Sequence, residues 1–240
     1  MADCACCSRD CMDKLCAHKI PVFSSLNSEQ IDHFSSIARH YQYRKGEPIT
    51  LEGQDLNALV ILNEGSAKAY KLTPDGREQI LYVFSQGDFF GERNLLGGRT
   101  SAYTVEALEP VRTCTFGREE FYALLRANPD IAIKVIEELE KRMERMENAV
   151  QSMGVRSLDS RIGGLLLDFA EKYGDQTPEG VLVRLPLSRE GMANFLGIAR
   201  ETVSRKLSQL EADGVLRPVG NKAILLLNGG ELRALAGKLE

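Results

Sequence analysis

The 240-residue sequence lacks any long run of apolar side chains. Its first residues, MADCACCSRDCMDKLC, carry Asp, Arg and Lys throughout, which argues against a signal peptide. No later apolar stretch reaches the roughly 20 residues that a membrane-spanning helix needs. We therefore expect a cytoplasmic protein that makes no contact with a membrane. Structural disulfides are rare in the cytosol, where clustered cysteines more often bind metal or sense redox state.

An excess of positive charge and the motifs of common enzymes are also missing. The formal net charge is −4, so any contact with DNA must come from local basic patches. The sequence has no P-loop, no Ser/His/Asp set and no paired-carboxylate site, so we do not expect an enzyme. Hydrophobic residues at 43% and charged residues at 27% are typical of a soluble globular protein, and the length fits one large domain or two ordinary ones.

Cysteine, in contrast, is concentrated at one end. We place a short, charged cysteine arm at residues 1–20, and it holds all but one of the 6 cysteines, namely Cys4, Cys6, Cys7, Cys11 and Cys16. The remaining cysteine, Cys114, lies far along the chain in ALEPVRTCTF. Thiolates grouped in this way indicate a metal or iron–sulfur site, or a thiol switch.

Residues 21–129 have the pattern of short strands separated by turns. LVILNEGSAKAYKL contains an apolar run, a Glu-Gly turn and a second stretch in strand register. In that second stretch, Lys68, Tyr70 and Leu72 share one face, and Ala67 and Ala69 share the other. TPDGREQILYVF then places a turn before another apolar strand. Strands at this spacing predict a small antiparallel sandwich or barrel.

Residues 130–153 change the hydrophobic period. In PDIAIKVIEELEKRMERMENAVQSMG, apolar side chains recur in steps of three and four, with Glu, Lys and Arg on the other faces. This narrow stripe predicts a helix that pairs with a second copy in a two-stranded coiled coil, with Gly154 placed to end it. A helix packed on its own core is the alternative, although such a helix usually has a wider apolar face. The predicted dimer interface consists of Ile136, Leu139, Met143, Met146, Val150 and Met153.

Residues 154–240 contain the pattern of a helix-turn-helix. In LPLSREGMANFLGIARETVSRKLSQLEADGVL, Ser188 is a suitable N-cap for a first helix, and Gly197 permits a sharp turn into a second. A strand then leads to a turn at Gly220 and Asn221 and to the segment KAILLL. These last features predict a wing hairpin.

The second of these helices presents a polar group of side chains away from its apolar positions, namely Glu201, Ser204 and Arg205. Side chains at the N-terminal end of such a helix can reach base edges in the major groove of double-stranded DNA. A helical hairpin with a solvated charged face is the alternative. The cap, the turn, the polar trio and the wing together favour a winged helix-turn-helix DNA-binding domain.

Taken together, these segments resemble the family of bacterial transcription regulators named for the cAMP receptor protein and FNR. ILNEGSAKAYKLTPDGREQILYVFSQGDFFGE resembles the family's cyclic-nucleotide-binding β-roll, and IARETVSRKLSQLEADGVL resembles its recognition helix. The resemblance implies an α+β fold with a β-roll over 21–129, a dimerisation helix over 130–153 and a winged helix-turn-helix over 154–240. It also implies a homodimer that has RNA polymerase as a partner.

In FNR-like relatives, the trio Glu-x-x-Ser-Arg reads a TTGA-type half-site. The resemblance therefore implies DNA with inverted TTGA…TCAA half-sites about one helical turn apart. Arginine can donate two hydrogen bonds to guanine, and glutamate can accept one from cytosine. The implied DNA-binding residues are Ser188, Arg189, Arg200, Glu201, Thr202, Ser204 and Arg205, of which Arg189 and Thr202 are expected to touch phosphates.

In cAMP-binding relatives, an arginine in the loop after a Gly-Glu pair holds the cyclic phosphate. The corresponding segment here is FGERNLLGGRTSAYTV, with Gly91, Glu92, Arg99 and Thr100 as the candidate residues. The connection from Glu92 to Arg99 is shorter than in those relatives, so we interpret these residues as a vestigial ligand pocket. A working site for a cyclic nucleotide or another small ligand is the alternative.

FNR-like relatives instead carry three cysteines before an IPF-like segment and a fourth in the last strand of the β-roll. Here IPVF follows the arm and Cys114 lies in that strand, so the resemblance implies a [4Fe–4S] cluster held by four thiolates. The first choice of ligands is Cys7, Cys11, Cys16 and Cys114, although the spacing within the arm departs from the family's pattern. Additional candidates are Cys4 and Cys6.

Other interpretations of the cysteines stay open: a thiol–disulfide switch between the arm and Cys114, a zinc site in the arm, or a buried core cysteine at 114. The histidines His18, His33 and His40 are not assigned a role. With a cluster, the expected function is a homodimeric, sequence-specific DNA-binding transcription regulator that senses oxygen or redox state. The intact cluster would favour the dimer, and its loss in oxygen would lower the affinity for DNA.

Overall fold

The computed structural model describes residues 20–24, 26–155 and 157–237. The chain divides into two compact units. The first unit comprises Met1–Lys71 and Leu81–Met143, and the second comprises Leu72–Ile80 and Glu144–Glu240. The predicted dimerisation helix therefore contributes its first part to one unit and its remainder to the other.

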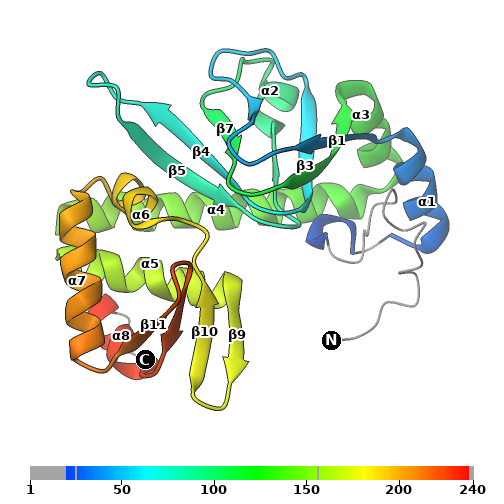
Figure 1. Ribbon diagram of the computed structural model, residues 1–240. Helices are drawn as coiled ribbons and strands as arrows, with labels where there is room; N and C mark the ends of the chain where they lie inside the picture. Colours follow the sequence, from blue (N-terminus) through cyan, green and yellow to red (C-terminus); the bar gives the residue numbers. More distant parts are fainter. Residues whose placement is uncertain (1–19, 25, 156, 238–240) are drawn as a thin grey trace. The chain divides into compact units, whose positions relative to one another are not determined.

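The first unit is built mainly from strands, with helices before and after them (Figure 1). Its elements are η3 (Pro21–Phe23), α1 (Ser28–Ile37), β1 (Arg39–Tyr43), β2 (Pro48–Thr50), β3 (Ala58–Glu64), β4 (Ala67–Leu72), β5 (Glu78–Phe84), β6 (Phe89–Phe90), α2 (Glu92–Gly97), β7 (Thr104–Ala107), β8 (Val111–Gly117), α3 (Arg118–Ala127) and the start of α4 (Pro129–Val155). The last residue of β4 and the first part of β5 fall within the Leu72–Ile80 segment of the second unit.

The strands form two four-stranded sheets, with the orders β1-β8-β3-β6 and β2-β7-β4-β5. Neighbouring strands run antiparallel, as where β8 lies between β1 and β3. Side chains from both sheets, including Val60, Phe84, Phe90 and Val105, form one buried cluster between them. The predicted antiparallel sandwich or barrel is confirmed.

Strand β3 explains how the first sheet is covered on both faces. Its residues 58–62 are all buried, as expected for a strand that lies between two cores rather than beside water. Val60 and Leu62 enter the cluster between the sheets, whereas Leu59 and Ile61 point to the opposite face. On that face lies a second cluster, here called the outer core, which contains Ile20, Val22, Phe23, Leu26, Ile31, Leu59, Ile61, Phe89, Leu95, Cys114, Phe116, Phe121, Leu124, Ile131 and Val135.

The alternation predicted for β4 is present. Ala67 and Ala69 are fully buried, whereas Leu72 at the end of the strand is 64% exposed. The turn after this strand is closed by Thr73, whose backbone N–H donates to the carbonyl of Arg77. Alternation and turn residues therefore sufficed to place the β4–β5 hairpin.

Helix α4 has two apolar faces with different surroundings. Ile131 and Val135 are buried in the outer core, so this side of the helix covers the first sheet. Ile136 and Met143 are 64% and 62% exposed, and they lie on the predicted seam. The helix ends at Val155, one residue beyond the predicted end at Gly154.

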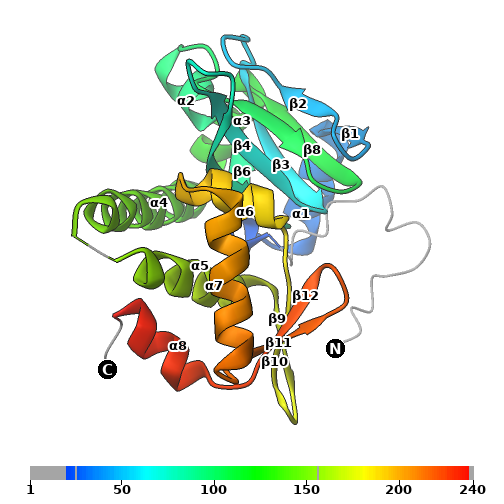
Figure 2. The ribbon, with the colours of Figure 1, turned by 60° about the vertical axis from the view of Figure 1, so that its left-hand side comes forward.

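The second unit contains the predicted helix-turn-helix and wing (Figure 2). Its elements are the end of α4, α5 (Leu158–Tyr173), β9 (Gly174–Thr177), β10 (Gly180–Arg184), α6 (Arg189–Leu196), α7 (Arg200–Ala212), β11 (Leu216–Val219), β12 (Ala223–Leu226) and α8 (Gly229–Ala236). The strands form one antiparallel sheet with the order β11-β12-β10-β9. None of the described helices is long and apolar enough to cross a membrane.

Candidate nucleic-acid interface and sensor site

Helix α6 begins where the sequence predicts. The Ser188 side chain accepts a hydrogen bond from the backbone N–H of Gly191 at 3.1 Å, which satisfies one of the free donors of the first helical turn. At the other end, Gly197 adopts a left-handed conformation with φ 64°, which a residue with a side chain rarely adopts. This glycine directs the chain from α6 into α7.

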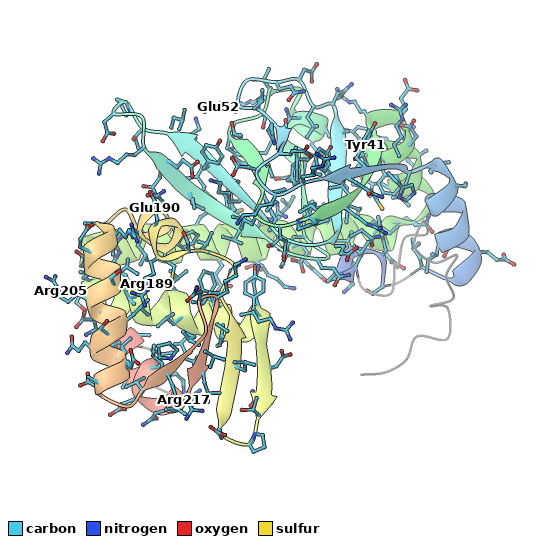
Figure 3. The ribbon with its side chains drawn as sticks, viewed as in Figure 1. Tyr41, Glu52, Arg189, Glu190, Arg205 and Arg217 are labelled. Atoms are coloured by element: carbon cyan, nitrogen blue, oxygen red, sulfur yellow. The ribbon has the colours of Figure 1, made fainter. Side chains whose placement is uncertain are left out.

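Helix α7 separates a buried face from a polar one. Val203, Leu207 and Leu210 are buried against the unit's core. Arg200, Glu201 and Arg205 are exposed, and Thr202 and Ser204 are partly exposed. Glu201, Ser204, Arg205 and Ser208 follow helical spacing and so share one face, and Arg205 points away from the helix (Figure 3). The predicted reading residues are thus brought together on a single accessible surface.

A partly buried ion pair holds a neighbouring face of α7. The Lys206 Nζ donates to the Asp159 carboxylate at 2.8 Å and contacts Gln209 Oε1 at 3.3 Å, and Lys206 is 8% exposed. The guanidinium of Arg161 also donates to the carbonyl of Leu196 at the end of α6. Both contacts tie the helix-turn-helix to α5, which limits how far α7 can rotate in its unit.

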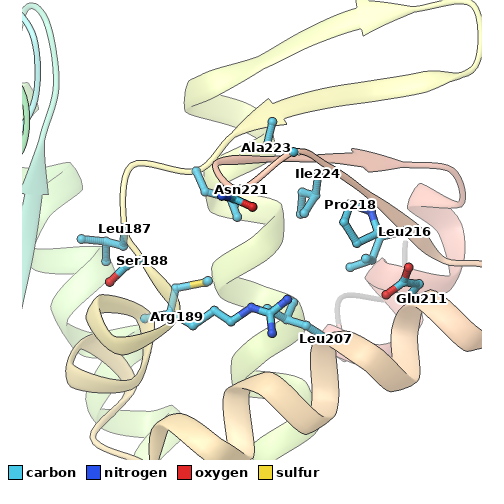
Figure 4. A pocket seen from close by; sticks show the side chains of 13 residues that line it. Leu187, Ser188, Arg189, Leu207, Glu211, Leu216, Pro218, Asn221, Ala223 and Ile224 are labelled. Atoms are coloured by element: carbon cyan, nitrogen blue, oxygen red, sulfur yellow. The ribbon is translucent and has the colours of Figure 1, made fainter.

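Arg189, at the first position of α6, extends into a small hollow between the wing hairpin and the two helices (Figure 4). The hollow is also lined by Leu207, Glu211 and Asn221. Arg189 is exposed, so its charge remains available to a phosphate. The structure thus places Arg189 at a helix start, where an arginine can contact the DNA backbone.

Cys114 lies on β8 within the outer core and is 0% exposed. Burial among apolar side chains raises the pKa of its thiol to about 12. The same face of β8 carries Phe116, whose ring packs edge-on against Phe23 with 6.0 Å between ring centroids. Ile20, Val22 and Phe23 are members of this core, so the last residue of the cysteine arm and the residues that follow it pack beside the strand that bears Cys114.

A histidine lies next to this thiol. His40 on β1 is the cross-strand partner of Cys114, and its Nδ1 lies 3.4 Å from the Cys114 Sγ. Strand β1 is at the edge of its sheet, and the His40 side chain is exposed. No local pattern in the sequence identifies His40, because only the pairing of residues 39–43 with 111–115 brings the two side chains together.

The arm residues Cys4, Cys6, Cys7, Cys11 and Cys16 lie outside the described residues, so their place in a site stays a prediction. Within 20–24, 26–155 and 157–237, no group of three or more His, Cys, Asp and Glu side chains could hold a metal ion. Of the predicted ligands, the described part of the chain therefore contributes Cys114 alone.

The predicted ligand pocket is divided between interior and surface. Gly91 is buried with φ 94°, and an added Cβ would lie 2.2 Å from the Ala58 carbonyl oxygen, so only glycine fits there. Glu92 is 6% exposed. Arg99 and Thr100, in contrast, are exposed in the loop after α2.

Glu92 is engaged by Arg142 of α4. The Arg142 guanidinium lies 3.3 Å from the Glu92 carboxylate, donates to the carbonyl of Phe89 and stacks over the rings of Phe84 and Phe89. Among the residues that the structure describes, the second carboxylate oxygen of Glu92 and the amide nitrogen of Asn94 are buried without a hydrogen-bond partner. No local pattern in the sequence identifies Arg142, because its contact with Glu92 spans 50 residues.

The predicted seam of α4 is partly exposed. Ile136, Met143 and Met146 are exposed, which fits side chains that a second helix would cover. Leu139 instead packs partly against the outer core. The side chains of Val150 and Met153 lie outside those the structure describes. Pairing through this seam stays a prediction.

Two family models match the chain. The cyclic nucleotide-binding domain matches residues 41–128, and the Crp-like helix-turn-helix domain matches residues 160–235. The first range runs from within β1 to the end of α3, and the second runs from within α5 into α8.

Named relatives extend the match to most of the chain. The nitrogen fixation regulation protein FixK of Bradyrhizobium diazoefficiens is 30% identical over 90% of this chain and 89% of its own length. The fumarate and nitrate reduction regulatory protein of Vibrio cholerae is 26% identical over 98% of this chain and 92% of its own length. The solved structure of FixK2 from Bradyrhizobium japonicum has a TM-score of 0.74 at 28% identity, covering 83% of this chain and 97% of that one.

These relatives are regulators and not enzymes, as the sequence predicts for this chain. The β-roll, the long helix and the winged helix-turn-helix, with the matched ranges, lead to one assignment. The chain belongs to the Crp/FNR family of DNA-binding transcription regulators.

Proposed function

We propose that this regulator senses oxygen through a [4Fe–4S] cluster held by Cys114 and by three cysteines of the arm, with Cys7, Cys11 and Cys16 as the first choice. The proposal extends to a homodimer that binds inverted TTGA…TCAA half-sites and acts through RNA polymerase. One observation supports it: Ile20 at the end of the arm and Phe23 just after it pack in the same core as Cys114, on one face of β8.

The length of the arm agrees with this geometry. Cys16 precedes Ile20 by four residues, and an extended chain spans at most about 14 Å over that distance. Ile20 and Cys114 belong to one packed core. The residue at which the arm joins the β-roll therefore lies in the same core as Cys114. The match to the Vibrio cholerae protein covers 98% of this chain, so it extends into the arm.

The chemistry of Cys114 also suits a cluster ligand. A thiol whose pKa is about 12 is almost wholly protonated at neutral pH, so it is a poor nucleophile for disulfide exchange. Metal coordination deprotonates a thiol outright, and an apolar shell limits access of water to a metal–sulfur bond. The raised pKa therefore argues against a thiol–disulfide switch at Cys114, and a cluster bound there must displace the same proton from the sulfur.

When bound, the cluster would supply an oxygen-labile link between the arm and β8. Residues of the outer core would transmit the loss of this link to α4. Ile20, Phe23, Ile131 and Val135 lie in one core, so the start of α4 packs with the residues that anchor the arm. An arm held to Cys114 would stabilise this core, and hence the position of α4, more than a free arm would. Such a difference in free energy is what couples a sensor to dimerisation and DNA binding.

Purification without oxygen tests the cofactor directly. We expect a brown protein with about four irons and four sulfides per chain. Cys114→Ser should remove the colour, whereas Cys4→Ser should leave it. A colourless anaerobic protein with stoichiometric zinc would contradict the proposal, and an arm–Cys114 disulfide found by mass spectrometry in metal-free protein would favour the switch instead.

A further inference from the structure

The contact between His40 and Cys114 lies outside the proposed set of cluster ligands. The two residues are paired across β1 and β8, and His40 Nδ1 lies 3.4 Å from Cys114 Sγ. Within the described part of the chain, His40 is the one hydrogen-bonding neighbour of this sulfur. Cys114 otherwise packs in the hydrophobic outer core.

The pair also joins a buried sulfur to a solvent-exposed side chain. Cys114 is fully buried, whereas His40 is exposed on an edge strand of the sheet. The backbone of β1 and the imidazole of His40 therefore lie between this sulfur and water on that side. A side chain that replaces the imidazole would change both the hydrogen bond to the sulfur and the shielding of the sulfur from water.

Ligation restricts how this hydrogen bond can form. A thiol can donate its S–H to Nδ1 or accept from it, whereas a metal-bound thiolate has no proton and can only accept. The Nδ1 atom must then carry the proton and donate to Sγ. Hydrogen bonds to ligand sulfurs are among the features by which a protein sets the stability and potential of an iron–sulfur cluster.

We infer that His40 is a positioning residue for the cluster: its Nδ1–H donates to the sulfur of Cys114 and covers that ligand on its solvent side. This inference rests on the proposed function, since it assumes that Cys114 is a ligand. His40 itself is not a ligand in this account, and the four thiolates remain sufficient to bind the iron.

Three variants separate the hydrogen bond from the bulk of the side chain. His40→Leu removes the donor, and His40→Asn keeps an N–H close to the position of Nδ1. Tyr41→Leu changes the neighbouring exposed residue, whose cross-strand partner is Thr113, and leaves the Cys114 pairing intact. All four proteins, including the wild type, are purified anaerobically and assayed for iron, visible absorbance and iron release to a chelator.

We expect all four proteins to contain the same iron when kept anaerobic. His40→Leu should release iron about 10-fold faster than the wild type, which is the lower range for loss of an outer hydrogen bond to a metal ligand. His40→Asn should restore a rate close to that of the wild type, and Tyr41→Leu should match it. Bleaching in air should follow the same order.

Two results would overturn the inference. Equal release rates for the wild type and His40→Leu would show that the hydrogen bond does not stabilise the ligand. Complete loss of iron in both His40 variants, with retention in Tyr41→Leu, would make His40 a ligand. A wild-type protein without iron would instead refute the proposed cluster, so the two failures are distinguishable.

Discussion

At the residue scale, α7 has one buried basic side chain that holds the helix in its unit and one exposed basic side chain that is available to a ligand. Lys206 is buried and bound to Asp159, so it orients the helix within its unit. Arg205, the next residue back, is exposed and points away from the helix. Adjacent basic residues thus differ in exposure because successive residues of a helix, about 100° apart, point to different faces.

Arg205→Ala should relax the recognition of guanine in each half-site. A bidentate arginine–guanine contact contributes roughly 1–3 kcal/mol to discrimination. Binding titrations on duplexes with the guanine kept or replaced would show a smaller difference for the variant. Arg189→Ala is the control, since loss of a phosphate contact weakens all sequences alike and reduces the salt dependence. An Arg205→Ala protein with unchanged preference would assign the reading to another residue.

Alkaline pH should destabilise the metal-free protein through its buried acids. Burial raises the pKa of Cys114 from 9.0 to about 12, and it raises the pKa of Tyr43, Tyr82 and Tyr103 above 10.0. The unfolded chain loses these protons at lower pH than the folded chain does. The free energy of unfolding is therefore unaffected by these groups below about pH 9 and falls as the pH rises above it.

Urea unfolding of the metal-free protein at increasing pH measures this effect. Cys114→Val removes one of the buried acids, so its stability should fall less steeply between pH ~9 and ~10 than that of the wild type. Parallel curves for the two proteins would mean that the thiol ionises in the folded state as easily as in the unfolded state.

At the element scale, α4 combines a face packed on the β-roll with a face that carries exposed apolar side chains. Ile131 and Val135 lie in the outer core, whereas Ile136 and Met143 are more than 60% exposed. Exposed side chains of this size on a helix rich in Glu, Lys and Arg indicate a surface covered by a partner. The steps of three and four residues fit a second copy of the same helix.

Met143→Glu should therefore shift the protein toward monomer. Two copies of the new carboxylate would face each other across the seam, at a cost on the order of 3 kcal/mol. A cost of that size corresponds to a rise of roughly 100-fold in the dimer dissociation constant. Sedimentation measures it, with Met143→Leu as a control that keeps the seam apolar. A Met143→Glu protein that remains dimeric at the same concentration would place the interface elsewhere.

At the scale of the whole molecule, the elements that could be predicted from the sequence are those with local signals. Ser188, Gly197 and the turn at Gly220 act on their own neighbours in the chain, so the helix-turn-helix and wing were predictable. The alternation of inward-facing and outward-facing residues around Ala67 and Ala69 likewise predicts strand β4.

Contacts between distant segments could not be predicted in this way. His40 and Cys114 are 74 residues apart, and Arg142 and Glu92 are 50 residues apart. The proximity of each pair depends on the order of the strands or the orientation of a helix. The period of the hydrophobic residues in the sequence does not specify either of these. The position of Cys114 in a strand was predicted, but its histidine neighbour required the pairing of β1 with β8.

The central claim is that oxygen controls DNA binding through the cluster at Cys114, and one measurement tests it most directly. Fluorescence anisotropy on a labelled TTGA…TCAA duplex, at fixed salt, compares the anaerobic protein before and after exposure to air, with Cys114→Ser alongside. We predict that the anaerobic wild type binds roughly 10- to 100-fold more tightly than the air-exposed protein, as expected for typical coupling energies, and that Cys114→Ser binds weakly in both conditions. Equal affinity of the wild type before and after air would contradict the account.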